Sequence, residues 1–257
     1  MSVSFEERDA VAYVRLERPE KRNALTGAML DRLAEIFAGV AARRDLRAVI
    51  LSGAGADFCA GTDIAELEGL DEEGARRKAA RGQEVCDAVE LCGTPVVAAV
   101  RGAAAGGGCE LALACHLRVA ARDARFGLPE ARLGVIPAYG GTQRLARAVG
   151  RGRALAAMLA GEELRADEAL RLGLVNRVAA PDEILREAEA LARAISDTAA
   201  PLAVRACLEA VTRGQDLPLA EGLQLEAELF SRLFSTTDMR EGTRAFLEKR
   251  PPVFQGK

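Results

Sequence analysis

Three consecutive glycines at positions 106–108 are followed closely by an acidic residue, Glu110, and a second acid, Glu130, comes directly after Pro129. Glycines that lead from a strand into a helix can leave backbone N–H groups free to stabilise negative charge on a ligand, or can simply serve a tight turn or close packing. Two carboxyl groups in unequal surroundings can hold different protonation states and move the proton and hydroxyl of water to separate atoms. If the fold brings Glu110 and Glu130 together, we expect hydration chemistry; otherwise each is an acid stabilised at a helix start.

Several other kinds of active site are excluded or weakened by the sequence. A single histidine, His116, excludes a His-Glu-x-x-His zinc site, and we expect a structural role for it. No Gly-x-Ser-x-Gly motif occurs, the only Gly-Lys pair is the terminal Gly256-Lys257, and the stretch at Gly53 lacks the third glycine of a dinucleotide fingerprint. Cys109 has no obvious basic partner, so we interpret it as a small apolar core residue.

The composition is that of an ordinary globular protein, with 257 residues of which 49% are hydrophobic and 28% charged. A net charge of −3 and only 4% aromatic residues argue against nucleic acid or an anionic membrane as a partner. The first seventeen residues are rich in charge, and the uncharged stretches fall short of the roughly 18 apolar residues of a membrane span. Six cysteines without a Cys-x-x-Cys pair indicate reduced thiols, so we expect a soluble cytoplasmic protein without a metal site.

A repeated strand, turn and helix pattern must position the glycine turn. Apolar runs at 48–51 and 95–100 are typical of buried parallel strands, and a glycine-bearing stretch follows each one. Alternation predicts a hairpin over residues 3–17, and helical spacing predicts a helix that begins after Thr26. The other predicted elements are a solvated helix over 71–90, strands over 117–121, 124–127 and 175–178, and helices over 140–149, 151–159, 166–172 and from Pro181.

The structural class changes near residue 200, because everything after Pro201 is predicted to be helical. We therefore divide the chain into an α/β core over residues 1–200 and a C-terminal helical lobe over residues 201–257. The lobe carries an apolar stripe that must pack on something, and we interpret another subunit as that surface. The stripe consists of Leu219, Leu223, Phe230, Leu233 and Phe234.

Taken together, the motifs resemble the enoyl-CoA hydratase/isomerase superfamily, also called the crotonase family, and most closely its enoyl-CoA hydratases. The matching blocks occur in the right order over nearly the whole chain. They are Arg18-Pro19 to Asn23-Ala24-Leu25, Phe58 to Ile64, Pro95 to Val100, Gly106 to Leu113, Phe126 to Glu130, Gly134 to Pro137, Gly140 to Leu145, Gly173 to Val175 and Ala245 to Arg250.

The resemblance implies a spiral of repeated ββα units with a C-terminal helical lobe, assembled as a homotrimer or a homohexamer. It implies an acyl-CoA thioester as substrate and water as the only co-substrate, with no separate cofactor, since coenzyme A is part of the substrate. The thioester oxygen is expected in an oxyanion hole formed by the backbone N–H groups of Thr62 and Gly107. Glu110 is then expected to hold and deprotonate water, and Glu130 to exchange the proton at C2.

The resemblance also places the substrate along two segments of this chain, while Phe246 and Lys249 are expected to reach the nucleotide on a neighbouring subunit. The expected substrate-binding residues are Arg22, Ala24, Leu25, Thr62, Asp63, Ile64, Ala65, Gly107, Phe246 and Lys249.

Four positions depart from the pattern of the best-matching hydratases. Thr62 stands where Ala is common, Ala65 where some relatives have a Lys that helps hold coenzyme A, and His116 where Asp is common. Tyr139 is expected to intrude on the acyl pocket. Two alternatives stay open: Δ3,Δ2-enoyl-CoA isomerisation or another acyl-CoA reaction, which the presence of both glutamates disfavours, and an RNA-binding role, which the net charge disfavours.

Overall fold

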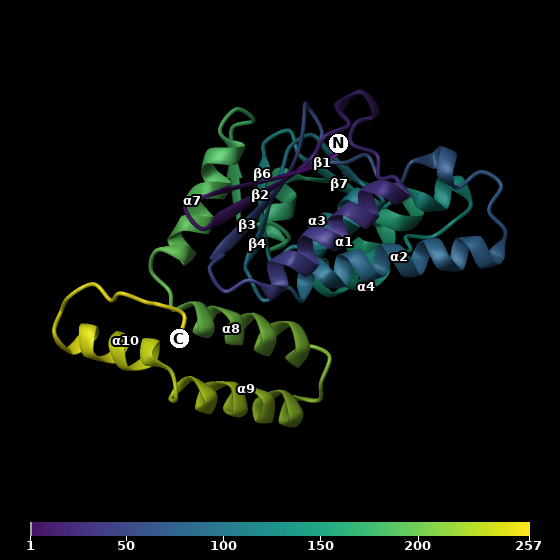
Figure 1. Cartoon of the computed structure of the whole chain (residues 1–257). Helices are drawn as coiled ribbons and strands as arrows, with labels where there is room; N and C mark the ends of the chain where they lie inside the picture. The colour runs from purple at the N-terminus through teal and green to yellow at the C-terminus, as the bar shows by residue number, and fades with distance from the viewer. Residues whose placement is uncertain (1) are drawn as a thin grey trace.

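Buried apolar strands build a six-stranded sheet in the computed structural model, which describes residues 2–257 (Figure 1). Strands β1 and β2 form the predicted hairpin, and the remaining neighbours pair in parallel. In spatial order the strands are β1 (Val3–Arg8), β2 (Val11–Leu16), β3 (Ala48–Gly53), β4 (Val96–Val100), β6 (Leu117–Ala121) and β9 (Arg177–Ala179).

Both faces of this sheet are covered, as the continuous apolar runs predict. In β3, Val49 and Leu51 belong to the larger apolar cluster, whereas Ala48 and Ile50 belong to a smaller one on the opposite face. Helix α7 (Ile184–Ser196) covers the smaller cluster (Figure 1). The larger cluster is enclosed by α1 (Gly27–Ala42), α2 (Glu72–Glu90), α3 (Gly107–Ala114) and α4 (Gly141–Val149).

A second, three-stranded sheet sets the position of the glycine turn. Strand β5 (Ala103–Ala105) pairs in parallel with β7 (Arg125–Gly127), which pairs in turn with β8 (Leu164–Arg165). The chain passes from β5 through Gly106 directly into α3, so the predicted strand, turn and helix unit is present here. Neither β5 nor β8 was predicted, because segments of three and two residues are too short to show a period.

The chain between α4 and α7 differs in detail from the prediction. The helix predicted over 151–159 is α5 (Arg151–Leu155) followed by a π-helical turn, η4 (Ala156–Ala160), and α6 (Ala166–Arg171) follows β8. The strand predicted over 175–178 is wrong at its start, since β9 begins at Arg177. The N–H groups of Leu174 and Val175 instead donate to the carbonyl of Ala169 and belong to the end of α6.

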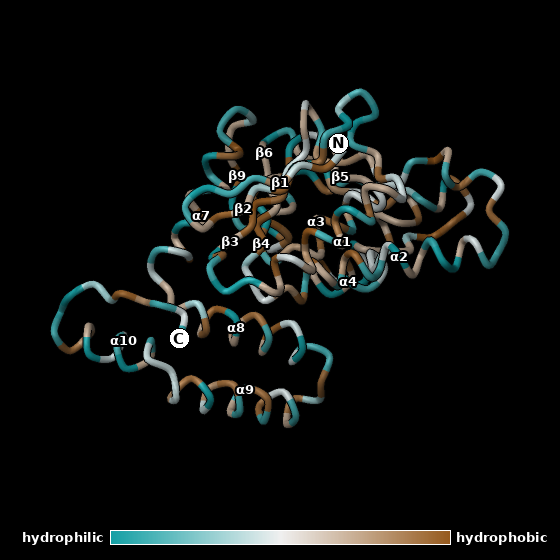
Figure 2. Tube along the Cα trace, in the orientation of Figure 1, coloured by the Kyte–Doolittle hydropathy of each residue, from teal (hydrophilic) through white to brown (hydrophobic). Residues whose placement is uncertain are grey.

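Three helices, α8 (Pro201–Gly214), α9 (Leu219–Leu233) and α10 (Thr237–Leu247), extend away from the sheet (Figure 1). Helices α8 and α9 pack on each other, and apolar residues recur along α9 (Figure 2), several of them exposed. Leu219 and Phe230 are 79% and 63% exposed. The apolar stripe predicted from the sequence therefore has no cover within the described chain. Among residues 2–257 no helix has the length and apolar character needed to cross a membrane.

His116 joins the end of α2 to the start of β4, in agreement with a structural role. Its Nδ1 accepts a hydrogen bond from Val96 N–H at 3.0 Å, and its Nε2 lies 2.9 Å from the carbonyl oxygen of Glu90. The ring is therefore neutral, with its proton on Nε2. Burial lowers the pKa of His116 to about 4, since the charged imidazolium would lose its solvation.

This environment predicts an acid-sensitive contribution to stability. The folded pKa lies below the ordinary value of about 6.5, so the unfolded chain binds the proton first and stability falls as the pH drops from about 6.5 towards about 4. Between pH 7.5 and pH 5, wild type should lose up to about 2 kcal/mol more stability than His116→Asn in urea denaturation. Equal losses in the two proteins would contradict the assignment.

Candidate active site

Two turns that are distant in sequence meet at the start of α3. Cys59 forms an isolated parallel bridge to Ala104 of β5, and Thr62 forms one to Leu25, so the segment 59–62 is held between β5 and the segment at Leu25. A Cβ placed on Gly107 would lie 3.1 Å from Thr62 Oγ1, so the two residues are neighbours. Within residues 2–257, neither the Thr62 N–H nor the Gly107 N–H donates a hydrogen bond to a protein acceptor. The two residues predicted to form an oxyanion hole are therefore neighbours, and both of their N–H groups lack an acceptor among the described residues.

Glycine is required at this turn because other groups occupy the space of a side chain. A Cβ on Gly108 would lie 2.4 Å from the carbonyl oxygen of Cys59, and one on Gly106 would lie 2.8 Å from Glu130 Oε1. Gly106 also has a φ of +49°, in the region that favours glycine. The close-packing interpretation of the triplet is therefore confirmed. The interpretation that its N–H groups stabilise negative charge on a ligand stays a prediction.

Glu110 is buried on α3, with only 2% of its surface exposed. Its Oε1 accepts hydrogen bonds from the backbone N–H groups of Tyr139 at 2.8 Å and Gly141 at 2.7 Å, at the start of α4. Burial raises the pKa of Glu110, and the two N–H donors oppose part of that rise by stabilising the carboxylate. These donors fix the orientation of the carboxyl group and favour its ionised form.

Glu130 begins the 3₁₀ helix η3 (Glu130–Leu133), and its carboxyl group lies against Gly106. Its Oε2 is buried and has no hydrogen-bond partner among residues 2–257. Burial is the main cause that raises the pKa of Glu130 to about 7, and the charge of Glu110 raises it further. The fold therefore brings the two glutamates to one turn in different environments, which spacing alone could not establish.

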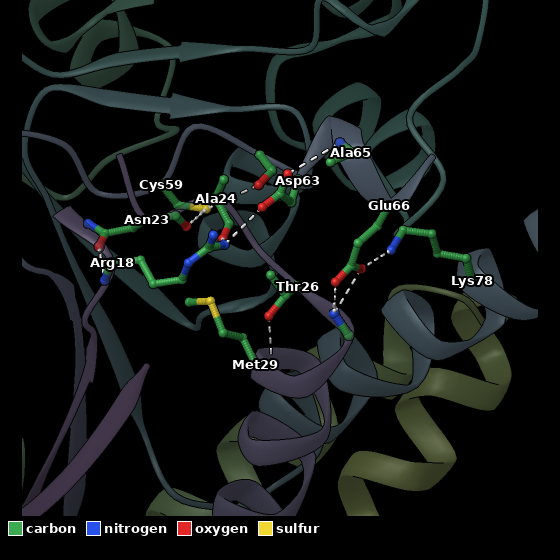
Figure 3. A network of polar contacts seen from close by, with 12 residues as sticks. Arg18, Asn23, Ala24, Thr26, Met29, Cys59, Asp63, Ala65, Glu66 and Lys78 are labelled. Atoms are coloured by element: carbon green, nitrogen blue, oxygen red, sulfur yellow. Dashed lines mark hydrogen bonds and ion pairs between the residues drawn. The ribbon is translucent and has the colours of Figure 1, made fainter. Parts of the chain in front are cut away.

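The segment from Arg18 to Leu25 is tied to the segment from Cys59 to Asp63 by a polar network (Figure 3). Arg18 Nη1 donates to the carbonyl of Ala24 at 2.7 Å and to Asp63 Oδ2 at 3.1 Å. The fully buried Asn23 donates to the carbonyls of Ala54 and Asp57. Arg18 and Asn23 are thus supporting residues whose side chains hold the predicted substrate segments in place.

Glu66 extends this network to α1 and α2 (Figure 3). Its carboxylate accepts from Gly27 N–H at the start of α1, at 2.9 and 3.0 Å, and pairs with Lys78 Nζ of α2 at 2.6 Å. Thr26 caps the same helix by accepting from Met29 N–H, as predicted. The sequence did not single out Glu66 or Lys78, because their partners lie 39 and 12 residues away.

The structure brings together most of the predicted substrate-binding residues but not all of them. Arg22 Nε is paired with Asp57 at 2.7 Å, and Ile64 is 60% exposed beside Asp63 in the short helix η2 (Ile64–Glu66). Leu25 is wholly buried, and its backbone pairs with Gly61 and Asp63, which joins the two predicted substrate segments. Its predicted contact with substrate stays a prediction.

Phe246 and Lys249 lie at the end of α10 and just beyond it, apart from α3 in the same chain (Figure 1). Phe246 is 83% exposed. Their predicted contact with a neighbouring subunit stays a prediction.

Cys109 is fully buried, and burial raises the pKa of its thiol, in agreement with a core role. Within the described part of the chain, no group of three or more His, Cys, Asp or Glu residues is gathered in a way that could hold a metal ion.

Comparison with known proteins identifies close relatives of the chain. The family model described as enoyl-CoA hydratase/isomerase matches residues 6–257. The chain is 40% identical over 250 residues to a short-chain-enoyl-CoA hydratase of Clostridium acetobutylicum, covering 97% of this chain and 95% of the relative. It is 42% identical to a crotonyl-CoA hydratase of Syntrophomonas wolfei, covering 100% of this chain and 98% of the relative.

Solved structures agree with the predicted crotonase-like fold. The crystal structure of an enoyl-CoA hydratase from Bacillus anthracis superposes with a TM-score of 0.95 at 38% identity, and the match covers 100% of both chains. One from Geobacillus kaustophilus gives a TM-score of 0.92 at 42% identity, over 100% of this chain and 99% of that one. The predicted fold is confirmed.

The environment of Glu130 predicts a carboxyl group that titrates near neutral pH. Infrared difference spectra between pH 5 and pH 9 should contain a protonated carboxyl band that disappears with a pKa of about 7. The band should be absent from Glu130→Gln and should titrate at lower pH in Glu110→Gln, because the neighbouring negative charge is then removed. A band that persists in Glu130→Gln would contradict the assignment.

Proposed function

Because this chain belongs to the enoyl-CoA hydratase/isomerase family, we propose that it adds water reversibly across the 2,3 double bond of an enoyl-CoA thioester to give a 3-hydroxyacyl-CoA. The observation that carries this proposal is the pair Glu110 and Glu130 at one glycine turn. Two N–H groups donate to Glu110, whereas no donor in the described part of the chain reaches Glu130 Oε2. Two carboxyl groups with separate protonation states are what addition of water to two carbons requires.

The thioester carbonyl oxygen accepts hydrogen bonds from the N–H groups of Thr62 and Gly107. Attack at C3 shifts negative charge onto that oxygen as an enolate, and donors already aimed at it stabilise the transition state more than the substrate. Loss of one such donor typically costs about 2.7–4 kcal/mol of activation free energy. Support comes from the adjacency of these two free N–H groups at the start of α3.

In the hydration direction, ionised Glu110 holds a water molecule and takes one of its protons while the oxygen forms a bond to C3. Protonated Glu130 gives its proton to C2, so the double bond is consumed and the enolate charge disappears. The site is left with a protonated Glu110 and an ionised Glu130, and a proton must pass back before the next turnover. Dehydration uses the same steps in reverse, with the roles exchanged.

Coenzyme A lies along the segments at 22–25 and 62–65 in this proposal. Arg22, Asp63, Ile64 and Ala65 provide side chains or backbone there, and the network around Arg18 and Glu66 holds the two segments together (Figure 3). Phe246 and Lys249 are expected to come from a neighbouring subunit, where the lysine ammonium can meet a phosphate.

We expect purified protein to remove the conjugated thioester absorbance of crotonyl-CoA and to yield a product heavier by one water. Glu110→Gln and Glu130→Gln should each lower kcat by about 100-fold to 10,000-fold, since each removes a proton-transfer group. Glu35→Gln, on the exposed face of α1, is the matched control and should keep full activity. As the pH rises through about 7, hydration should slow because Glu130 loses its proton.

The alternative, double-bond isomerisation, predicts a different result from the same assay. A wild type that leaves crotonyl-CoA untouched but converts a 3-enoyl-CoA to its conjugated isomer would replace the hydratase proposal. The two-carboxylate mechanism would be overturned if either glutamine variant hydrated crotonyl-CoA at the wild-type rate.

We also propose that the chain assembles as a homotrimer or homohexamer through the lobe after residue 200. The uncovered side of α9 supports this, with Leu219, Leu223, Phe230 and Phe234 all more than half exposed. An apolar stripe of this kind normally marks an interface.

Light scattering should give a mass of three or six copies of the 27.2 kDa chain. Phe230→Asp should lower that mass because it places a charge in the stripe, whereas Glu228→Gln, an exposed charge on the same helix, should leave it unchanged. A monomeric wild type, or a Phe230→Asp protein of unchanged mass, would contradict the proposal.

A further inference from the structure

The ring of Tyr139 fills the gap between α2 and the first turn of α3. A Cβ placed on Gly82 of α2 would lie 1.9 Å from Tyr139 Cδ1 and 2.3 Å from Cγ, so the ring rests directly on that glycine. On the other side, a Cβ on Gly107 would lie 3.1 Å from Tyr139 Cε2. The side chain is only 4% exposed. The ring therefore forms a wall between the two helices.

Tyr139 touches three parts of the candidate site at once. Thr62 Oγ1 donates to its hydroxyl oxygen at 3.2 Å, its backbone N–H donates to Glu110 Oε1 at 2.8 Å, and its ring contacts the position of Gly107. The preceding residue is also tied to α2, because Gln83 Nε2 donates to the carbonyl of Ala138 at 2.9 Å. These contacts hold the ring in one place.

This location bears on the length of the acyl chain. If the thioester oxygen lies at the N–H groups of Thr62 and Gly107 and C3 lies by Glu110, the ring borders the substrate from the carbonyl to C3. In that placement, carbons beyond C3 extend towards the ring of Tyr139. The ring cannot move towards α2, because it is already in contact with Gly82. Moving a side chain in a closely packed interior to make room for extra atoms costs free energy.

We infer that the ring of Tyr139, seated on Gly82, closes the acyl end of the site and makes the enzyme selective for short-chain 2-enoyl-CoA thioesters such as crotonyl-CoA. The inference rests on the proposed function and adds its substrate class. Tyr139 is here a specificity-determining residue. Gly82 is a positioning residue, because its lack of a side chain leaves room for the ring.

The test compares kcat/KM for crotonyl-CoA and trans-2-octenoyl-CoA. Wild type should favour crotonyl-CoA, and Tyr139→Ala should raise the octenoyl-to-crotonyl ratio by at least about tenfold, since each methylene admitted to an apolar pocket is worth a factor of that order. Tyr139→Phe keeps the ring and should keep the wild-type ratio. If the alanine variant does not fold, Tyr139→Leu allows the same comparison of the octenoyl-to-crotonyl ratio, because leucine fills part of the space of the ring.

Gly82 provides an independent arm. Gly82→Ala must displace the ring and should lower kcat/KM for crotonyl-CoA, whereas the double variant Gly82→Ala/Tyr139→Ala should show no further loss relative to Tyr139→Ala alone. Gly39→Ala is the matched control, because Gly39 also lies inside a helix but has open space where its Cβ would be.

Binding of saturated butyryl-CoA and octanoyl-CoA by calorimetry separates this inference from the hydratase proposal, since it needs no turnover. Tighter octanoyl-CoA binding in Tyr139→Ala than in wild type would support the inference that the ring closes the acyl end of the site. Unchanged ratios and affinities in folded Tyr139→Ala or Tyr139→Leu, or a wild type that handles octenoyl-CoA as well as crotonyl-CoA, would overturn it while leaving hydration intact. A wild type that hydrates neither thioester but binds both would overturn the proposed function and the inference with it.

Discussion

Close approach between backbone segments at the start of α3 is the constraint on which the rest of the site depends. Gly108 lies against the carbonyl of Cys59, and Gly106 lies against the carboxyl group of Glu130. A side chain at position 108 would collide with backbone, which cannot move aside without disturbing the bridge between Cys59 and Ala104. The separation of these segments sets the distance between the N–H groups of Thr62 and Gly107, and it sets where Glu110 enters the core.

The two glutamates show how a fold can give the same side chain two chemical characters. Glu110 is more deeply enclosed, yet the N–H groups of Tyr139 and Gly141 supply what water would otherwise supply to a carboxylate. Burial raises the pKa of Glu130 to about 7, and within the described chain no donor reaches its buried Oε2 to offset that rise. Burial raises the pKa of both carboxyl groups, and the two N–H donors to Glu110 oppose part of the rise there.

Much of this arrangement could be predicted from local sequence patterns. The hairpin, the Thr26-capped helix, the buried strands and the helices after Pro201 all follow from periodicity and capping, because each depends on residues close in the chain. The donors to Glu110 could not be predicted in that way, since Tyr139 and Gly141 lie 29 and 31 residues from it. Strand β9 begins later than predicted because the N–H groups of Leu174 and Val175 bond locally to the carbonyl of Ala169 in α6, which the apolar pattern of the sequence does not reveal.

The contact between Gly82 and Tyr139 also restricts the order in which this chain can change during evolution. A larger residue at position 82 is tolerated only after position 139 has become small, since the ring occupies the space that a Cβ would need. A smaller residue at position 139, in contrast, can arise first without a collision. Descendants with a side chain at position 82 should therefore carry a smaller side chain at position 139, and the two residues should vary together although they lie 57 positions apart in the sequence (139 minus 82).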